Sequence, residues 1–310
     1  MNLKKKKIFL AGHKGMVGSS ILRYLKKNNY KNIITINKNK LNLLNQRDTE
    51  NFIKKIKPDF VINAAARVGG ILANYKFKAD FIYENLMIQT NVINSSYKAG
   101  VKKLIFLGSS CIYPRECPQP IREDYLLTSS LEQTNEPYAL AKICGVKLCE
   151  NYNRQYSTNF VSVMPTNLFG PNDNYHLENS HVLPAFIRKA HEAKLREDKS
   201  FVVWGSGNPM REFLYVDDMA SAAIYVLNLD SEVYRSNTSP MLSHINVGSG
   251  IDYSIKELVK VIANVVGFRG KIEYDKTKPD GAPRKLMDVS RLSHLGWNSQ
   301  VSLEEGLKRT

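Results

Sequence analysis

The sequence lacks an apolar run long enough to span a membrane. A transmembrane helix needs roughly 20 consecutive, predominantly apolar residues, and the longest candidate, FVINAAARVGGILA, is interrupted by Arg67. The N-terminal stretch MNLKKKKIFLAG carries lysines but continues directly into a short apolar run and glycines, without the h-region and cleavage site of a signal peptide. We therefore expect a cytoplasmic protein that is not inserted in a membrane.

Cysteine is scarce, and its spacing argues against the common metal and redox motifs. The four cysteines, Cys111, Cys117, Cys144 and Cys149, form none of the CxxC pairs that zinc sites and thiol redox motifs use. We expect no metal site. Cys144 and Cys149 lie in a helical stretch, where we expect both to be buried spacers.

Negative charge is in the minority. The chain has 44 Lys and Arg residues against 29 Asp and Glu residues, a formal net charge of +15, and such an excess can indicate nucleic-acid binding. The lysines are scattered through amphipathic stretches such as YLKKNNYKN and FIKKIKPD, and there is no arginine cluster, zinc finger or aromatic RNA-binding signature. We expect the positive potential to serve a ligand with several phosphates and expect no nucleic-acid partner.

Buried strands and amphipathic helices alternate in the first half of the chain. The pattern predicts strands at 6–12, 32–38, 59–66 and 102–110, and helices at 16–29, 45–57, 80–100 and from Pro137 onward. This alternation indicates right-handed βαβ units and a parallel sheet. The predicted fold class is therefore α/β, a doubly wound Rossmann sheet with a smaller α/β substrate-binding domain.

A glycine-rich turn, GHKGMVG, joins the first expected strand to the first helix. Glycine there allows a tight turn and lets a pyrophosphate approach backbone N–H groups at the helix N-terminus, where the helix dipole favours anions. Turns use glycine in any case, but the position of this one at the start of a βαβ series predicts dinucleotide binding. The turn contains Gly12, Gly15 and Gly18.

The end of the second expected strand indicates which dinucleotide binds. It lacks the carboxylate that would hold the ribose hydroxyls of NAD and has Asn37, Lys38 and Asn39 instead. With Lys14 in the glycine turn, Lys38 could hold a 2′-phosphate, which favours NADP(H), although either lysine alone could equally be a solvated surface charge. The expected cofactor-binding residues are Gly12, Lys14, Gly15, Met16, Gly18, Lys38 and Lys142.

A YxxxK pair follows in the helix that begins near Pro137. Tyr138 and Lys142 are four residues apart and share one helix face, and an ammonium beside a phenol lowers the phenol pKa, so that the tyrosine can exchange protons near neutral pH. Ser109, at the end of the fourth expected strand, can hydrogen-bond a substrate carbonyl. Because successive strand residues alternate between faces, we expect Ser109 and Cys111 on one side and Ser110 on the other.

Several stretches together resemble a known family over almost the whole chain. AGHKGMVGS, GSSCIYP, QTNEPYALAK, VMPTNLFGPNDN and VVWGSGNPMREFLYVDDMA resemble the extended short-chain dehydrogenase/reductase family and are similar to its GDP-L-fucose synthase branch. The resemblance implies NADPH-dependent conversion of GDP-4-keto-6-deoxy-D-mannose to GDP-L-fucose, by 3,5-epimerisation followed by reduction of the 4-keto group. It also implies a homodimer formed by the helices around 82–99 and 138–156.

The resemblance also implies the roles of the site residues. Cys111 and His181 would move protons at carbons 3 and 5, although a lone loop histidine is more often structural. Tyr138 would protonate the developing alkoxide, with Lys142 orienting the nicotinamide ribose and Ser109 polarising the carbonyl. The residues implied to line the GDP-sugar pocket are Asn167, Val182, Lys189, Trp204, Arg211, Asp280 and Lys285.

Some features leave alternatives open. Lys14 and Lys189 stand where the family leads us to expect arginine, and Arg211 could instead pair with Asp217 or Asp218 to hold the domains together. We expect residues 1–168 to bind NADP(H), with about 216–250 crossing back to that domain, and 169–310 mainly to bind the GDP-sugar. The alternative functions are a 4-reductase of a related GDP-4-keto sugar, such as a deoxy-heptose, without epimerase activity, and a non-catalytic nucleotide- or nucleic-acid-binding Rossmann protein.

Overall fold

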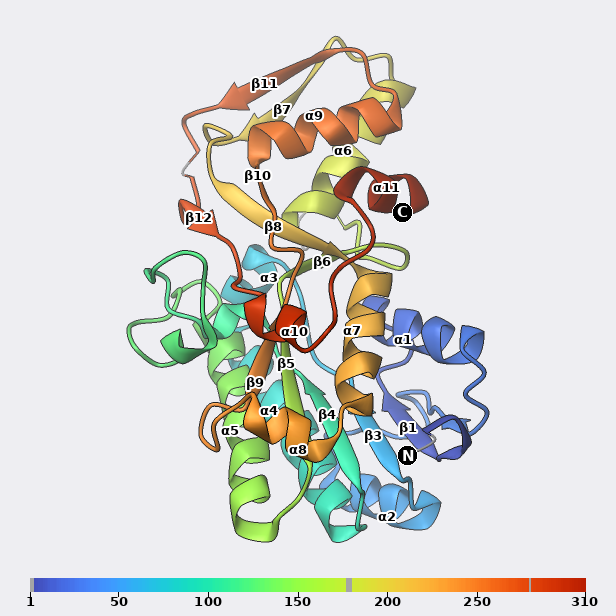
Figure 1. The fold of residues 1–310 in the computed structure, drawn as a ribbon. Helices are drawn as coiled ribbons and strands as arrows, with labels where there is room; N and C mark the ends of the chain where they lie inside the picture. Colours follow the sequence, from blue (N-terminus) through green and yellow to red (C-terminus); the bar gives the residue numbers. More distant parts are fainter. Residues whose placement is uncertain (1–2, 177–179, 279) are drawn as a thin grey trace.

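A parallel sheet forms the centre of the protein in the computed structural model, which describes residues 3–176, 180–278 and 280–310 (Figure 1). Its six strands lie in the order β2-β1-β3-β4-β5-β9, and every neighbouring pair is parallel. The predicted doubly wound α/β fold is therefore confirmed. The strands are β1 (Ile8–Ala11), β2 (Ile33–Ile34), β3 (Phe60–Asn63), β4 (Lys103–Leu107), β5 (Phe160–Pro165) and β9 (His244–Val247).

Helices cover both faces of this sheet because its strands are apolar on both sides. Ile8 and Leu10 of β1 pack in the cluster that contains apolar residues of α1 (Met16–Lys27) and α7 (Val216–Asn228). Phe9, between them, points the other way, into the cluster with α2 (Gln46–Ile56), α4 (Lys78–Lys98) and α5 (Glu136–Tyr156). The alternation follows from the two-residue period of a strand and places α5 against β4 and β5.

The observed elements differ from the expected ones in two places. The strand expected at 32–38 is only Ile33–Ile34, an edge strand that pairs with β1 alone, and the residues that follow it up to Lys38 are partly or fully exposed. The structure also contains the short helix α3 (Ile71–Lys76) before α4, which the sequence pattern did not predict. The predicted helix near Pro137 is confirmed, since α5 begins at Glu136 with the proline in its first turn, where proline is well tolerated.

The two cysteines of α5 were expected to be buried, and this is wrong for one of them. Cys149 is buried, whereas Cys144 is exposed. Five positions along an α-helix rotate the side chain by about 140°, so when one of the two faces the sheet, the other faces away from it.

A smaller α/β part lies above the large sheet in Figure 1. Strand β8 is its centre, antiparallel to β10 and parallel to β6 and β12, and β7 pairs with β11 beside it. Three helices share an apolar core with these strands. The elements are β6 (Asn167–Phe169), β7 (Ser200–Trp204), β8 (Met210–Tyr215), β10 (Asp252–Ser254), β11 (Lys271–Asp275), β12 (Arg284–Lys285), α6 (Val182–Leu195), α9 (Ile255–Val266) and α11 (Leu303–Arg309).

The chain passes between the two parts more than once. After β8 it forms α7, which packs on α1, then α8 (Ser231–Ser236) and β9, the sixth strand of the large sheet. It later returns as α10 (Ser290–His294), which packs near β9. The division of the chain at residue 168 stays a prediction. Within the described residues, no helix is long and apolar enough to cross a membrane.

Candidate active site

The glycine turn after β1 is packed so tightly that side chains would not fit. A Cβ on Gly12, whose φ is +83°, would lie 2.6 Å from the backbone of Ala64, and a Cβ on Gly18 would lie 2.1 Å from the carbonyl oxygen of Gly12. Helix α1 then begins at Met16, with Gly15 as an N-cap that makes no side-chain capping bond. The turn thus presents backbone N–H groups at a helix N-terminus, an arrangement that suits a pyrophosphate.

The two lysines assigned to the 2′-phosphate lie on neighbouring segments. Lys14 follows β1 and Lys38 follows β2, and both side chains are exposed. Because parallel neighbours end at the same edge of the sheet, both segments leave the sheet on the side where dinucleotides bind in such folds. Met16, the remaining residue predicted in this group, is half-buried in the first turn of α1.

Ser109, Tyr138 and Lys142 come together between β4 and α5. The Lys142 ammonium lies 5.7 Å from the centroid of the Tyr138 ring and donates a hydrogen bond of 2.7 Å to the Leu107 carbonyl at the end of β4. A hydrogen bond with Ser109 acts on the Tyr138 hydroxyl. The three side chains that the sequence analysis grouped therefore lie close together, and their catalytic roles stay a prediction.

The electrostatics of the pair differ from expectation. Burial raises the pKa of Tyr138 well above its usual value, the nearby Cys111 raises it further, and the Ser109 hydrogen bond lowers it. Burial also lowers the pKa of Lys142 to about 7. The expectation that Lys142 lowers the tyrosine pKa is wrong here, because the ammonium is desolvated and hydrogen-bonds the Leu107 carbonyl.

Cys111 reaches the same site by a route that strand alternation did not predict. Strand β4 ends at Leu107, and Ser110–Ile112 form a single turn of 3-10 helix, η2. Ser109 Oγ caps this turn by accepting a hydrogen bond of 3.3 Å from the Cys111 backbone N–H. The prediction from a strand period is therefore wrong, but the turn still brings the thiol close enough to influence Tyr138 electrostatically.

Asn135 is a residue of the site that the sequence analysis missed. Its Nδ2 donates a hydrogen bond of 3.3 Å to Cys111 Sγ, while its Oδ1 is buried without a hydrogen-bond partner among the described residues. Asn135 is the N-cap residue of α5, three positions before Tyr138. An asparagine directly before the predicted helix, close to Tyr138, was the feature of the sequence that could have indicated this residue.

His181 is the N-cap residue of α6, with Val182 as the first residue of the helix. Both residues are exposed, yet desolvation by surrounding atoms lowers the pKa of His181. A lowered pKa keeps the imidazole neutral near pH 7, when it can accept a proton. Its pairing with Cys111 stays a prediction.

The other residues predicted to bind the sugar nucleotide gather around β8 and β7. Arg211 of β8 is in register with Lys285 of β12, and its guanidinium donates a hydrogen bond of 2.7 Å to the Ala282 carbonyl. Burial lowers the pKa of Arg211, and the Asp280 carboxylate opposes that change. The planar guanidinium of Arg211 can bind a phosphate with two parallel hydrogen bonds. It is partly desolvated, and the nearby Asp280 carboxylate could move away when a phosphate binds.

Trp204, at the end of β7, presents an exposed ring between two lysines. The Nζ atoms of Lys189 and Lys278 lie 5.3 Å and 5.7 Å from its ring, and burial lowers the pKa of Lys189. An exposed indole flanked by cations can stack on an aromatic base whose phosphates lie nearby. Asn167, on β6, instead donates its side-chain amide to the Glu212 carbonyl, 2.8 Å away.

The alternative pairing of Arg211 with Asp217 or Asp218 is wrong. Asp217 forms an ion pair of 2.7 Å with Arg23 of α1, and Asp218 accepts hydrogen bonds from the backbone N–H groups of Gln300 and Val301. The two carboxylates therefore fasten α7 to α1 and to the segment before α11, away from Arg211.

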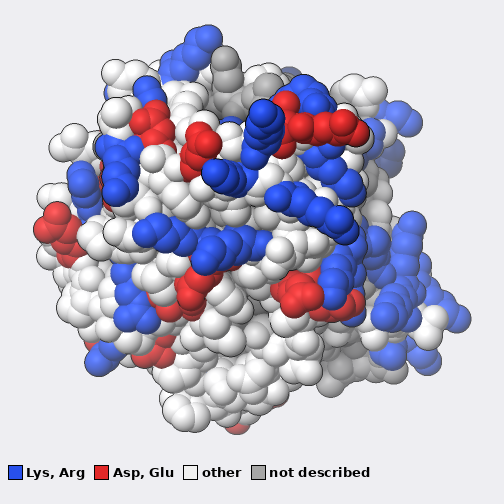
Figure 2. Space-filling model, turned by 90° about the horizontal axis from the view of Figure 1, so that it is seen from above, with Lys and Arg blue, Asp and Glu red and all other residues white. Residues whose placement is uncertain are grey.

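Charge on the side of the smaller part is predominantly but not uniformly basic. Figure 2, a view from above, shows Lys and Arg side chains spread over this face with Asp and Glu among them. Interspersed carboxylates weaken the continuous basic patch that a nucleic-acid surface needs. In the described part of the chain, no group of three or more His, Cys, Asp or Glu residues could hold a metal ion.

These observations define a dinucleotide-dependent enzyme. The chain belongs to the NAD dependent epimerase/dehydratase family, whose model matches residues 8–248. It is 54% identical to the GDP-L-fucose synthase of Escherichia coli (strain K12) over 308 residues, which cover 99% of this chain and 96% of that enzyme. It is also 54% identical to GDP-L-fucose synthase 1 of Arabidopsis thaliana over 310 residues, which cover 100% of this chain and 93% of that enzyme.

The fold is similar to that of a solved enzyme of related chemistry. MlghC, a GDP-mannoheptose C4 reductase from Campylobacter jejuni with NADP bound, superposes with a TM-score of 0.90 and 39% identity, covering 99% of this chain and 97% of that one. Together with the two synthases, it confirms the resemblance found in the sequence.

Proposed function

We propose that this protein converts GDP-4-keto-6-deoxy-D-mannose to GDP-L-fucose with NADPH, by epimerisation at carbons 3 and 5 and reduction at carbon 4. The observation that carries the proposal is the meeting of Cys111 with Ser109, Tyr138 and Lys142 at the end of β4. A proton-exchanging thiol and a reductase triad at one place match a two-step reaction. The 54% identity to GDP-L-fucose synthases over the whole chain supports the same reaction.

NADP(H) fits the glycine turn. Gly12 and Gly18 leave no room for side chains there, so the backbone can approach a pyrophosphate closely, and Lys14 and Lys38 supply exposed positive charge for a 2′-phosphate. The similar Campylobacter jejuni reductase has NADP bound. When bound, NADPH supplies the hydride that reduces carbon 4.

Epimerisation requires two proton-transfer groups. The 4-keto group acidifies the protons on carbons 3 and 5, and inversion needs one group to remove a proton and another to return it from the opposite face. Cys111 and His181 take these roles. The Asn135 amide donates a hydrogen bond to the Cys111 sulfur and holds it in place.

Reduction uses the residues of α5 and the end of β4. Ser109 hydrogen-bonds the 4-keto oxygen and Tyr138, and Tyr138 donates its proton to the developing alkoxide. The raised pKa of Tyr138 keeps the phenol protonated until then. Lys142, fixed by the Leu107 carbonyl, orients the nicotinamide ribose.

The GDP moiety is held by the smaller part of the protein. Arg211 and Lys285, which are in register on β8 and β12, bind the diphosphate, and Trp204 stacks on the guanine. Asp280, which now accepts two hydrogen bonds from Ser206, turns to a substrate hydroxyl or base N–H. Asn167, Val182 and Lys189 complete the pocket.

A second candidate is a 4-reductase of a related GDP-4-keto sugar without epimerase activity. The similarity to a GDP-mannoheptose C4 reductase favours it, while Cys111 and His181 favour the two-step reaction. The intact triad argues against a non-catalytic Rossmann protein. We also expect a homodimer through α4 and α5 and a cytoplasmic location.

NMR of the product decides between the two enzymes. The protein is incubated with GDP-4-keto-6-deoxy-D-mannose and NADPH in deuterated water. GDP-L-fucose labelled at carbons 3 and 5 supports the proposal. A reduced sugar with the configuration of the substrate at both carbons and no label identifies a 4-reductase and overturns it.

A further inference from the structure

A buried polar network begins at Tyr113, two residues beyond Cys111. Tyr113 is 3% exposed, and its hydroxyl donates to Asn246 Oδ1 on β9. The Asn246 Nδ2 donates in turn to the carbonyls of Ile121, at 2.9 Å, and Asp288, at 3.1 Å. Since both amide hydrogens point to carbonyls, the oxygen of Asn246 must face Tyr113.

The remaining partners fix the proton positions. His244 Nε2 lies 3.1 Å from the Tyr113 hydroxyl. Because that hydroxyl gives its only proton to Asn246, Nε2 must carry a hydrogen and donate it to the Tyr113 oxygen. The other ring nitrogen, Nδ1, is buried and has no hydrogen-bond partner within the described residues, which agrees with a neutral ring protonated at Nε2.

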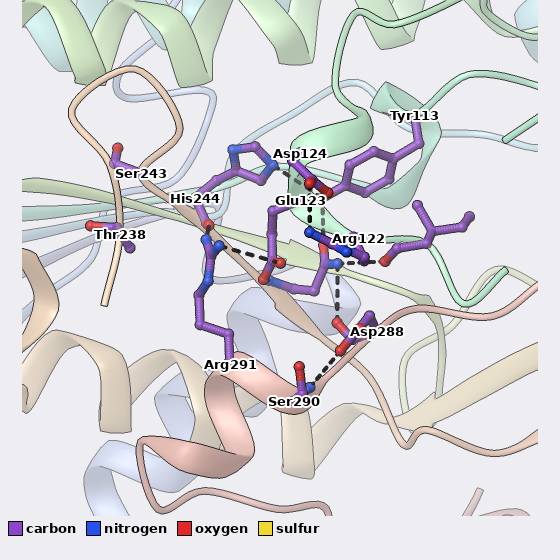
Figure 3. Close-up of polar contacts among 12 residues, drawn as sticks. Tyr113, Arg122, Glu123, Asp124, Thr238, Ser243, His244, Asp288, Ser290 and Arg291 are labelled. Atoms are coloured by element: carbon purple, nitrogen blue, oxygen red, sulfur yellow. Dashed lines mark hydrogen bonds and ion pairs between the residues drawn. The ribbon is translucent and has the colours of Figure 1, made fainter. Parts of the chain in front are cut away.

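Glu123 and Arg291 close the network on its other side. Glu123, in the short 3-10 helix η3 (Glu123–Tyr125), accepts a hydrogen bond of 3.1 Å from the Asn246 backbone N–H and lies 3.7 Å from the Arg291 guanidinium. Arg291, on α10, also donates to the His244 carbonyl at 3.1 Å. Figure 3 shows these side chains converging from the loop after β4, from β9 and from α10.

This network lies on a long segment that has little regular structure of its own. Between the end of β4 at Leu107 and the start of α5 at Glu136 there are only short 3-10 turns, and Cys111 stands near the beginning. The turn is tied on one side by Ser109 Oγ and on the other by Tyr113. The Tyr113 ring packs in an apolar cluster, while its hydroxyl contacts Asn246 and His244, so these contacts fix the orientation of the side chain.

We propose that Tyr113, held by Asn246 and His244, is a positioning residue that sets the place of the Cys111 thiol and thereby controls proton exchange at carbons 3 and 5. This inference rests on the function proposed above. Tyr138 and Lys142 are held independently by α5 and by the Leu107 carbonyl. Ser109 precedes the turn, next to the end of β4, whereas Cys111 lies within the turn that Tyr113 follows. Loss of the Tyr113 anchor should therefore affect epimerisation much more than hydride transfer.

The test compares Tyr113→Phe with Tyr234→Phe. Tyr234 is a matched control, since it is also buried and its hydroxyl donates to the Ser243 carbonyl beside β9, a bond that involves no residue of the Cys111 turn. Three rates are measured: iodoacetamide alkylation of Cys111 in the ligand-free protein, with exposed Cys144 as internal reference; deuterium incorporation from solvent at carbons 3 and 5; and NADP⁺-dependent oxidation of GDP-L-fucose, which needs no epimerisation.

We expect Tyr113→Phe to lower deuterium incorporation by about 10- to 100-fold, as for a reacting group displaced by about 1 Å, and to change Cys111 alkylation relative to Cys144. Oxidation of GDP-L-fucose should change much less, and Tyr234→Phe should leave all three rates near those of the wild type. Equal losses in exchange and oxidation, or unchanged exchange and alkylation, would overturn the proposal.

A second variant and an independent measurement keep the test decisive. If circular dichroism shows that Tyr113→Phe does not fold, Asn246→Ser is measured instead. This substitution shortens the side chain that accepts the hydrogen bond of the Tyr113 hydroxyl, and the same three rates are compared. The alkylation of Cys111 requires no substrate. A wild-type protein that makes no GDP-L-fucose would refute the proposed function, whereas the alkylation result would still decide the positioning role.

Discussion

The side-chain amide of Asn135 donates a hydrogen bond to the sulfur of Cys111 across 3.3 Å. The contact fixes the position of the sulfur at the end of β4, beside the first turn of α5. The two residues lie 24 positions apart in the sequence, Cys111 in the turn after β4 and Asn135 at the N-cap of α5.

The first prediction concerns this contact. Asn135→Ala should reduce solvent exchange at carbons 3 and 5 by roughly 2- to 10-fold, the equivalent of one hydrogen bond, and should change the rate of Cys111 alkylation because the sulfur is no longer held in place. Peptide mass spectrometry measures the alkylation, and Gln133→Ala, an exposed position in the same segment, is the control. Identical alkylation in both variants would show that the amide does not act on the thiol.

The second prediction separates the two half-reactions. Cys111→Ser leaves Tyr138 and Lys142 in place, so it should still bind the keto sugar and reduce it slowly without inversion, but lose deuterium incorporation at carbons 3 and 5. Tyr138→Phe should keep that incorporation while NADPH consumption nearly stops. NMR and absorbance at the NADPH band measure the two outcomes. Normal exchange and normal GDP-L-fucose production by Cys111→Ser would leave the thiol without a catalytic role.

The third prediction concerns the choice of cofactor. NADPH should be preferred over NADH because Lys14 and Lys38 bind the 2′-phosphate. Loss of a charge-assisted contact costs about 1.5–3 kcal/mol, or roughly 10- to 150-fold in affinity, so Lys38→Asp should bring the two cofactors close to parity. The ratio of kcat/KM values measures this, with Lys31→Asp, at the opposite end of β2, as control. Equal use of NADH by the wild type would contradict the assignment.

The fourth prediction follows from the buried amine of Lys142. Burial lowers its pKa from 10.5 to about 7, so between these pH values the unfolded chain binds more protons than the folded one, and the free energy of unfolding rises with pH. Lys142→Met removes this contribution. The free energy of unfolding of Lys142→Met relative to that of the wild type should therefore fall as the pH rises from 7 to 10.5. At about 1.36 kcal/mol for each pH unit, the total decrease is at most about 5 kcal/mol.

Denaturant unfolding of the ligand-free protein at several pH values measures that difference. Lys142→Met also loses the hydrogen bond to the Leu107 carbonyl. That loss lowers the free energy of unfolding of the variant at every pH, so it does not produce the expected pH dependence. The control is Lys31→Met, because Lys31 is exposed. If the difference in free energy of unfolding between the wild type and Lys142→Met stays constant from pH 6 to pH 10, Lys142 is not desolvated as the structure indicates.

The fifth prediction concerns the expected homodimer. Helices α4 and α5 pack side by side and carry exposed apolar residues, among them Tyr83, 59% exposed, and Leu140, 38% exposed. Light scattering at micromolar concentration should give twice the mass of one chain. Tyr83→Glu should shift this mass toward the monomer, whereas Leu195→Glu, at an exposed apolar position on α6, should not. A monomeric wild type would refute the dimer.

Local sequence patterns were sufficient to predict much of the fold and the residues proposed for reduction. The alternation of buried strands and helices predicts the parallel sheet, and the positions of four of its strands follow from apolar runs, because burial on both faces demands them. The glycine turn and the four-residue spacing of Tyr138 and Lys142 are likewise local, since both depend on the geometry of one turn and one helix.

Other features depend on neighbours that no local pattern identifies. Strand β2 is shorter than its apolar run because an edge strand has one partner. The Tyr138 pKa rises because burial disfavours the charged phenolate and the Ser109 hydrogen bond opposes this only in part, and burial is a property of the packed molecule.

The sequence by itself determined the doubly wound fold, the glycine turn and the residues of the triad, because the periods of strands and helices, their order along the chain and the turn glycines can all be recognised locally. Only the tertiary structure decided that Cys111 leaves β4 in a 3-10 turn, that Asn135 reaches its sulfur, and that Tyr113 is anchored to Asn246, 133 residues away. Contacts between such distant segments form when the sheet, the loop and α10 are packed together, and the desolvation that gives them their strength arises only then.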